Sequence, residues 1–182
     1  MGIVKRKNLK DSLAVVGNVV LGVALLLLAA APVRAQDPDD VGIPVGSTPA
    51  APKIEDLARN QVDLAKYVGH GPVLLEFWAQ WCPICKELEP KMTAAHAKFG
   101  KQVTFIAVSV AVNETPASIQ RHLTEHPMPY QVLWDSGGNA TRAFQAVATS
   151  YVVILNAKGV VTYTGTGSDQ DIEAALAKVI KS

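Results

Sequence analysis

The strongest constraint on this chain is its only pair of cysteines, Cys82 and Cys85, which are separated by two residues. An apolar, strand-like run precedes the pair, and a segment with helical spacing follows it. A disulfide between the two would close a very small loop and would restrict the unfolded chain little. A structural zinc site usually takes four ligands from two such pairs, and the chain has no second pair. Compared with a zinc half-site or two ordinary buried thiols, the spacing at a predicted strand–helix junction favours a redox-active dithiol.

The residues next to the cysteines predict a different role for each sulfur. Pro83 falls at the first position of the predicted helix, where a missing N–H has no cost, so Cys82 falls where the helix begins. Free N–H groups and the positive end of the helix dipole favour the Cys82 thiolate and lower its pKa. Cys85 lies one turn deeper and is expected to be less exposed. We therefore predict that Cys82 attacks a substrate disulfide and that Cys85 resolves the mixed disulfide.

The region after residue 72 predicts alternating strands and helices. The predicted strands are 73–77, 103–110, 130–134, 151–155 and 160–164, and the predicted helices are 83–99, a segment opening at Thr115 and Pro116, 139–147 and a last helix capped by Ser168. Pro90 lies inside the first helix and is expected to kink it. The alternation indicates an α/β layered domain, and the closing hairpin makes its sheet mixed.

The cysteine segment resembles the active site of the thioredoxin superfamily. That pattern is an apolar strand with an acidic residue, Phe-Trp-Ala, then Trp-Cys-x-x-Cys-Lys and a proline five residues after the second cysteine. The chain has each part in register: Glu76, Phe77-Trp78-Ala79, Trp81, Cys82, Cys85, Lys86 and Pro90. The resemblance covers residues 53–182 and is greatest to exported TlpA/ResA-type thiol-disulfide oxidoreductases. The helix and strand between Val112 and Trp134 resemble an insertion of that group.

The resemblance implies a thioredoxin-like fold, with a central mixed β-sheet flanked by helices. It implies no cofactor besides the redox-active Cys82–Cys85 disulfide, and a monomer. The expected partners are exported protein disulfide substrates and a membrane electron donor of the thiol type. Cytochrome c or copper-protein maturation is the expected setting.

Glu76 is the next candidate catalytic residue. It lies six residues before Cys82 in an apolar strand, where burial would raise its pKa and allow it to carry a proton. Related thioredoxins have an aspartate at the matching position, so the resemblance implies that Glu76 is a general base for Cys85. The alternative is an edge-facing glutamate that reaches solvent.

Four further residues are candidate substrate contacts. Trp81 is predicted to be a surface ring beside Cys82, with Pro83 next to it, whereas Trp78 is predicted to pack beneath the loop. Thr149 and Ser150 fall where thioredoxin-like proteins have a residue followed by a cis-proline. Because a cis bond before a residue other than proline costs about 3 kcal/mol, we expect the Thr149–Ser150 peptide to be trans. The serine also brings a hydroxyl and an N–H that would open the dithiol to metal ions. The four histidines, His70, His96, His122 and His126, are predicted to lie on the surface without a metal.

The amino end predicts export. Lys5, Arg6, Lys7 and Lys10 precede an apolar run at 13–31, and Val33-Arg34-Ala35 has the form of a cleavage site. This describes a signal peptide at 1–35, although the run is also close to the ~20 residues that span a bilayer, so an uncleaved membrane anchor is the alternative. The acidic segment 36–52, rich in Pro and Gly, is interpreted as a linker before a domain at 53–182. Either way, the domain is expected to be extracytoplasmic, in the periplasm or on the outer face of the cytoplasmic membrane.

Charge excludes one class of partner. Twelve basic and fifteen acidic residues follow residue 35, and no basic patch predicts nucleic-acid binding. Three functions remain: a thiol-disulfide oxidoreductase that reduces disulfides in exported proteins, a metal-handling copper module that uses the same dithiol without turnover, and a peroxide reductase. The third lacks the proline- and threonine-bearing motif expected before a peroxidatic cysteine.

Overall fold

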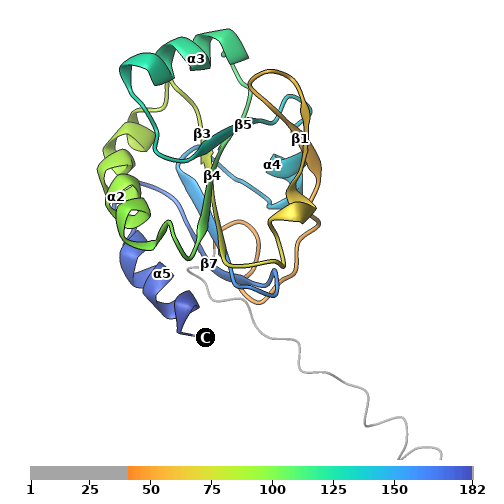
Figure 1. Ribbon diagram of the computed structural model, residues 1–182, viewed down its shortest axis with the longest axis vertical. Coiled ribbons are helices and arrows are strands. Elements are labelled where there is room, and N and C mark those ends of the chain that lie inside the picture. The colour runs from red at the N-terminus through yellow and green to blue at the C-terminus, as the bar shows by residue number, and fades with distance from the viewer. Residues whose placement is uncertain (1–40, 182) are drawn as a thin grey trace, which may run out of the picture. The chain divides into compact units, whose positions relative to one another are not determined.

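The computed structural model describes residues 41–181, which contain a seven-stranded sheet in the order β2-β1-β5-β4-β3-β6-β7 (Figure 1). The strands are β1 (Lys53–Asp56), β2 (Gln61–Asp63), β3 (Val73–Trp78), β4 (Thr104–Ser109), β5 (Gln131–Trp134), β6 (Tyr151–Leu155) and β7 (Val161–Gly165). The helices are α2 (Pro83–Phe99), α3 (Pro116–Glu125), α4 (Asn139–Ala143), α5 (Ile172–Ile180) and the short 3-10 helix η1 (Leu64–Lys66). The sheet is mixed, as predicted, because β3 pairs in parallel with β4 and antiparallel with β6.

Strand β3 is the centre of the sheet and leads directly to the cysteines. All six of its residues are buried, because helices cover both faces of the strand. Val73, Leu75 and Phe77 pack into one core with α4 and η1, whereas Leu74 packs into a second core under α2 and α5. In Figure 1, α2 and α5 lie along one side of the sheet, α4 lies beside β1 and α3 lies at one end of the sheet.

The predicted elements agree closely with those observed where the ends are marked by local capping signals. Helix α2 begins at Pro83 and ends at Phe99, as predicted, and α3 begins after Thr115, whose side chain accepts a hydrogen bond from the Ser118 N–H in a capping box. Strand β6 also has its predicted bounds. Pro90 lies within α2, and the kink predicted there stays a prediction.

Three predictions about the elements need correction. Strands β1 and β2 were not predicted, since they are short and carry charged residues. Helix α4 ends at Ala143 rather than at 147. The last helix is capped by Asp171 rather than by Ser168. The Asp171 carboxylate accepts a hydrogen bond from the Ala174 N–H at 3.0 Å, whereas the backbone carbonyl of Ser168 accepts one from the Lys91 ammonium group at 2.7 Å.

Residues 41–52, the described part of the expected linker, form no helix or strand but lie against the domain. Ile43 is buried in the first core, and its N–H donates to the Tyr151 hydroxyl at 3.0 Å. The Gly46 N–H donates to the Val161 carbonyl, and the Val161 N–H donates to Ser47, both at 2.8 Å. The predicted signal or anchor at 1–35 lies outside the described residues. Within residues 41–181, no helix has both the length and the apolar character that crossing a bilayer requires.

Candidate active site

The two cysteines form a disulfide at the beginning of α2. Cys82 is the N-cap residue, and its sulfur accepts the Cys85 N–H at 3.0 Å, so the helix N-terminus is directed at this sulfur. Pro83 occupies the first turn, as predicted, and it is exposed. Cys82 is 4% exposed and Cys85 is 1% exposed, so both residues are buried, and Cys85 is the less exposed of the two, as predicted.

A surface cavity of about 280 Å³ opens beside the disulfide. Its walls come from the end of β3, the active-site loop, α2 and α3, and its lining residues are Trp78, Ala79, Gln80, Trp81, Cys82, Pro83, Lys86, Glu89, His122 and His126. Trp81 is 48% exposed, while Trp78 is buried, and both positions agree with the sequence prediction. The cavity therefore gives a substrate access to the Cys82 side of the disulfide.

Of the two histidines that line this cavity, His126 is exposed, as predicted, whereas His122 differs from the prediction. His122 is half-buried, with its ring centroid 5.7 Å from that of Trp78 and 4.8 Å from that of His126. Burial and the neighbouring His126 lower the pKa of His122. The spacing of four residues on one helix is the signal that could have placed the two imidazoles together. Even so, no cluster of three or more His, Cys, Asp or Glu side chains in the described residues is arranged to hold a metal.

Glu76 is buried under α2, with 1% of its surface exposed, so the alternative of a solvent-reaching glutamate is wrong. Its Oε2 accepts the Tyr130 hydroxyl at 3.2 Å. Burial raises the pKa of Glu76, the Tyr130 hydrogen bond lowers it and the charge of Glu89 raises it, so that the pKa is about 7. The carboxyl can therefore take up and release a proton near neutral pH.

A second buried carboxylate, Glu114, was missed by sequence reasoning. It follows β4, and its Oε2 accepts the N–H of Gln80, two residues before Cys82, at 3.0 Å. Its Oε1 accepts the Ser109 hydroxyl. Burial raises the pKa of Glu114, and these hydrogen bonds oppose the increase.

Two more hydrogen bonds connect the same loops. The Gln80 side-chain amide donates to the Ser118 hydroxyl at 2.8 Å, and the Trp81 indole N–H donates to the Val112 carbonyl at 2.7 Å. The segment 109–118, which leads into α3, therefore holds the active-site loop in place.

Ser150 lies just before β6 and adopts a left-handed backbone conformation with φ of +65°. The Thr149–Ser150 peptide is trans, as predicted, and the described residues contain no cis peptide bond. The Ser150 N–H donates to the Phe77 carbonyl at 2.8 Å, and its hydroxyl accepts the Gly167 N–H at 3.1 Å. The buried Gln170, another residue that sequence reasoning missed, donates its amide to the Ser150 carbonyl at 2.9 Å. Each polar group that serine brings thus has a partner inside the fold. Thr149 is half-buried.

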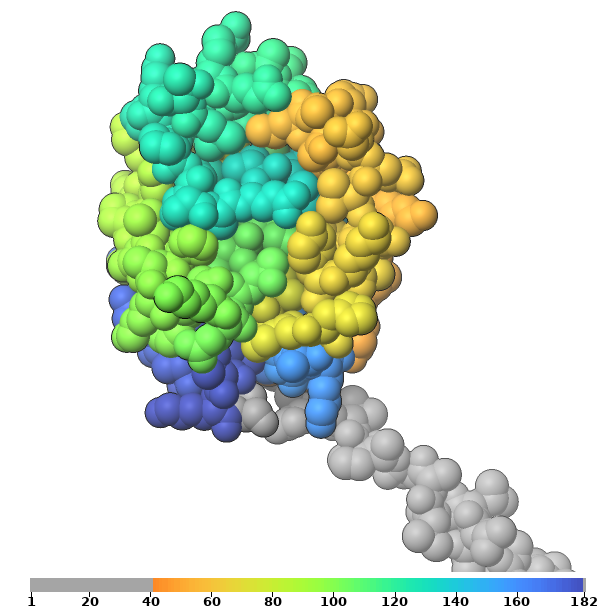
Figure 2. Space-filling model, viewed as in Figure 1, coloured from red at the N-terminus to blue at the C-terminus, as the bar shows by residue number. Residues whose placement is uncertain are grey.

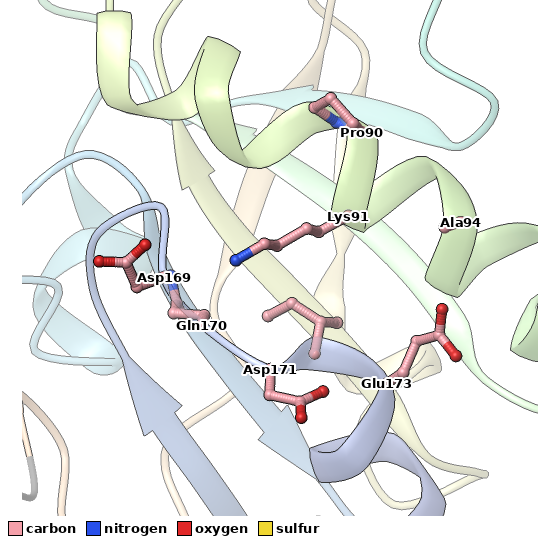
Figure 3. Close-up of a pocket in the computed structure, with 8 residues that line it drawn as sticks. Pro90, Lys91, Ala94, Asp169, Gln170, Asp171 and Glu173 are labelled. Atoms are coloured by element: carbon pink, nitrogen blue, oxygen red, sulfur yellow. The ribbon is translucent and has the colours of Figure 1, made fainter.

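A larger cavity of about 580 Å³ lies between α2 and the beginning of α5 (Figure 3). Lys91 extends across it toward the loop that carries Asp169 and Gln170. Neither cysteine lines this cavity, so the candidate active site is the smaller one.

Comparison with known proteins supports the same chemistry. The sequence model of the AhpC/TSA family matches residues 45–164. The thiol-disulfide oxidoreductase ResA of Bacillus subtilis is 26% identical over 115 residues, which are 63% of this chain and 63% of ResA. Thiol-disulfide oxidoreductase YkuV of the same organism is 28% identical over 90 residues, 48% of this chain and 61% of YkuV. The chain thus spans less than two thirds of the length of these two relatives.

Solved structures confirm the thioredoxin-like fold. StoA from Bacillus subtilis has a TM-score of 0.59 at 17% identity, covering 71% of this chain and 97% of StoA. A secreted Mycobacterium tuberculosis disulfide oxidoreductase, described as homologous to Escherichia coli DsbE, has a TM-score of 0.60 at 20% identity, covering 69% and 94% of the two chains.

Proposed function

The chain belongs to the AhpC/TSA family, and from this premise we propose that it is a thiol-disulfide oxidoreductase of the ResA/StoA type. One observation carries the proposal: the Cys82–Cys85 disulfide caps the N-terminus of α2 and borders an open cavity. A helix N-terminus stabilises a thiolate, and the cavity admits a partner to the sulfur that carries it. The similarity to ResA and YkuV supports this activity.

The mechanism that the geometry supports begins with the reduced dithiol. The Cys82 thiolate attacks a substrate disulfide, forms a mixed disulfide and releases one substrate thiolate. Cys85 then attacks the Cys82 sulfur, which regenerates the internal disulfide and releases the second substrate thiol. Glu76 accepts the Cys85 proton in this step, because its raised pKa places it between carboxyl and carboxylate near neutral pH.

We propose that the substrates are disulfides in exported proteins, including those of cytochrome c or copper-protein maturation. The basic and apolar amino end supports export, as does a structural neighbour described as secreted. In this role the protein acts as a reductant. Its Cys82–Cys85 disulfide is then reduced again by a thiol-type donor in the membrane. Trp81 and Pro83, which line the cavity, form the substrate-facing surface of this proposal, whereas Ser150 is buried and neither it nor Thr149 lines the cavity.

Trapping with the full chain tests the activity and the two cysteine roles. Cys85→Ser should accumulate a mixed disulfide through Cys82 with an unfolded, disulfide-containing substrate such as insulin, whereas Cys82→Ser should not. The wild-type chain should reduce insulin with dithiothreitol as donor. A trap formed only by Cys82→Ser would reverse the roles, and no turnover by the wild type would contradict the activity. The measured reduction potential then decides direction: a reductant lies near about −270 mV and a strong oxidant near about −120 mV.

The second candidate is a copper-handling module that uses the same dithiol without turnover. The observation in its favour is that Cys82 borders an open cavity, because thiolates bind Cu(I). Competitive chelator titration of the reduced chain with Cu(I) separates the two functions. Tight binding without insulin reduction would support the copper module.

A further inference from the structure

The buried Glu76 carboxyl has a hydrogen-bond partner from a distant part of the chain. The hydroxyl of Tyr130, the residue before β5, donates to Glu76 Oε2 at 3.2 Å. The Tyr130 ring is held in place by aromatic neighbours, with centroids 5.8 Å from Phe105 and 5.5 Å from His96. The phenol therefore has a fixed position from which to orient the carboxyl.

Glu76 lies on the face of β3 that α2 covers. Along β3, Leu74 packs with the middle of α2, and Trp78 packs with Cys82 and Cys85 at its beginning. Glu76 is on the same face of the strand as both, because side chains alternate along a strand, so it sits beneath the first turns of α2. Tyr130 approaches from the other end of the sheet, where β4 and β5 begin.

The Tyr130 ring also borders a surface depression of about 390 Å³. This depression includes His70, His96 and residues 100–105, and it does not include either cysteine. Figure 2 shows the segments that form it, where the green end of α2 and start of β4 meet the yellow residues before β3 and the teal residues before β5. Solvent thus reaches the Tyr130 ring from a depression that neither cysteine lines.

We propose that Tyr130 is a positioning residue that orients the Glu76 carboxyl and favours its ionised form for proton transfer with Cys85. This inference rests on the proposed function, and it adds a residue that the resemblance did not suggest. The titratable groups that act on Glu76 from the packed elements are Tyr130 and Glu89 of α2.

The step that Tyr130 supports is resolution of the mixed disulfide. The Cys85 thiol gives its proton to the Glu76 carboxylate, and its sulfur attacks the Cys82 sulfur. The Cys82–Cys85 bond forms, the bond from Cys82 to the substrate sulfur breaks, and the electron pair leaves with the substrate thiolate. The dithiol is oxidised and the substrate disulfide is reduced. Because only the carboxylate form of Glu76 accepts the proton, a hydroxyl that donates to the carboxylate favours this step.

The variant Tyr130→Phe tests the proposal, since it removes the hydroxyl and keeps the ring. Loss of the hydrogen bond should raise the pKa of Glu76, so less carboxylate is present as the pH falls. In the pH profile of the resolving rate, the acid limb should shift to higher pH by about one unit. The rate below neutral pH should therefore fall by about fivefold to tenfold. Alkylation of Cys82 should change little. Tyr67→Phe is the matched control, because it removes another tyrosine hydroxyl with a 3.2 Å hydrogen bond, to Gln131.

A double variant separates positioning from simple packing. In a Glu76→Gln background, Tyr130→Phe should produce no further change in the resolving rate or its pH profile. An acid limb that stays in place, or an equal slowing by Tyr130→Phe in both backgrounds, would overturn the proposal.

Direct titration of the Glu76 carboxyl by NMR, with ¹³C-labelled glutamate, needs no substrate. The pKa measured for Glu76 should be higher in Tyr130→Phe even if the chain fails to reduce insulin. This measurement therefore separates failure of the inference from failure of the proposed function. An unmoved Glu76 titration would overturn the inference.

Discussion

At the residue scale, the site contains two kinds of residue. Some can be recognised from the residues next to them in the sequence, and others come from distant parts of the chain. Cys82, Cys85 and Glu76 were predictable, because strand burial and the helix N-terminus follow from adjacent residues. Tyr130 and Glu114 were not, since they contact Glu76 and Gln80 across 54 and 34 residues of chain. A polar side chain outside a motif has no local signal that tells which buried group it will meet.

Ser150 shows that a residue in a familiar position can be held in a different way. The resemblance predicted consequences of a missing cis-proline, but the structure gives the serine N–H, hydroxyl and carbonyl partners at Phe77, Gly167 and Gln170. The hydroxyl and N–H that were expected to open the dithiol to metal ions are engaged in these bonds. At this position the backbone is fixed by three hydrogen bonds, and not by the ring of a proline.

We predict that Ser150→Pro destabilises the protein. Proline holds φ near −65°, whereas Ser150 has φ of +65°, and proline lacks the N–H that donates to Phe77. The loss should be on the order of 2–3 kcal/mol in the free energy of unfolding, measured with urea. Ser150→Gly is the control: glycine accepts the positive φ and keeps the N–H, so its change should stay within about 1 kcal/mol. Equal stability of the proline variant would show that the backbone can rearrange without cost.

At the element scale, helices with strong caps were predicted better than the short strands β1 and β2. Thr115 and Pro116, like Cys82 and Pro83, specify a helix start within a few residues. Strand β1 instead exists because it pairs with β5 and β2, and its sequence Lys-Ile-Glu-Asp has little strand character by itself. Such a strand depends on pairing partners that local patterns do not reveal.

We predict that Glu114 couples the active-site loop to the segment that leads into α3. Glu114→Ala leaves the Gln80 N–H and the Ser109 hydroxyl without their buried acceptor, so the free energy of unfolding should fall by about 2–3 kcal/mol. Reduced Cys82 should also react faster with iodoacetamide, because the loop that covers it loosens. Glu114→Gln keeps one acceptor oxygen, so its free energy of unfolding should fall by less. Glu87→Ala, an exposed change on α2, is the control. If Glu114→Ala has the same alkylation rate and the same free energy of unfolding as the wild type, the loop keeps its position without this carboxylate.

At the scale of the whole molecule, the order of the sheet places every part of the site around one strand. β3 lies between β4 and β6, so Glu76 on β3, Glu114 after β4 and Ser150 before β6 converge near the beginning of α2. The resemblance predicted this fold class, and the comparisons confirm it. The pairing of β1 with β2 and the docking of residues 41–52 depend on tertiary contacts, so the sequence pattern did not contain them.

The chain as a whole is expected to function outside the cytoplasm. The basic residues before 13–31 should stay in the cytoplasm while the domain crosses the membrane. A reporter that is active only after export, fused after Ser182, should therefore be active, and the same fusion lacking residues 1–35 should not. Activity of a cytoplasm-specific reporter in the full-length fusion would contradict export. Amino-terminal sequencing then decides between cleavage after Ala35 and a retained anchor.

The two cysteines allow the same cells to report the redox state of the exported chain. Cys82 and Cys85 are its only cysteines, so a mass-tagged maleimide that adds two labels measures the reduced active site alone. An oxidising compartment favours the disulfide, so a reductant must be reduced again by a thiol donor to stay active. We expect two labels in growing cells, and loss of both labels when thiol donation across the membrane is blocked. A chain that stays fully oxidised while its donors are intact would indicate that electrons flow in the opposite direction.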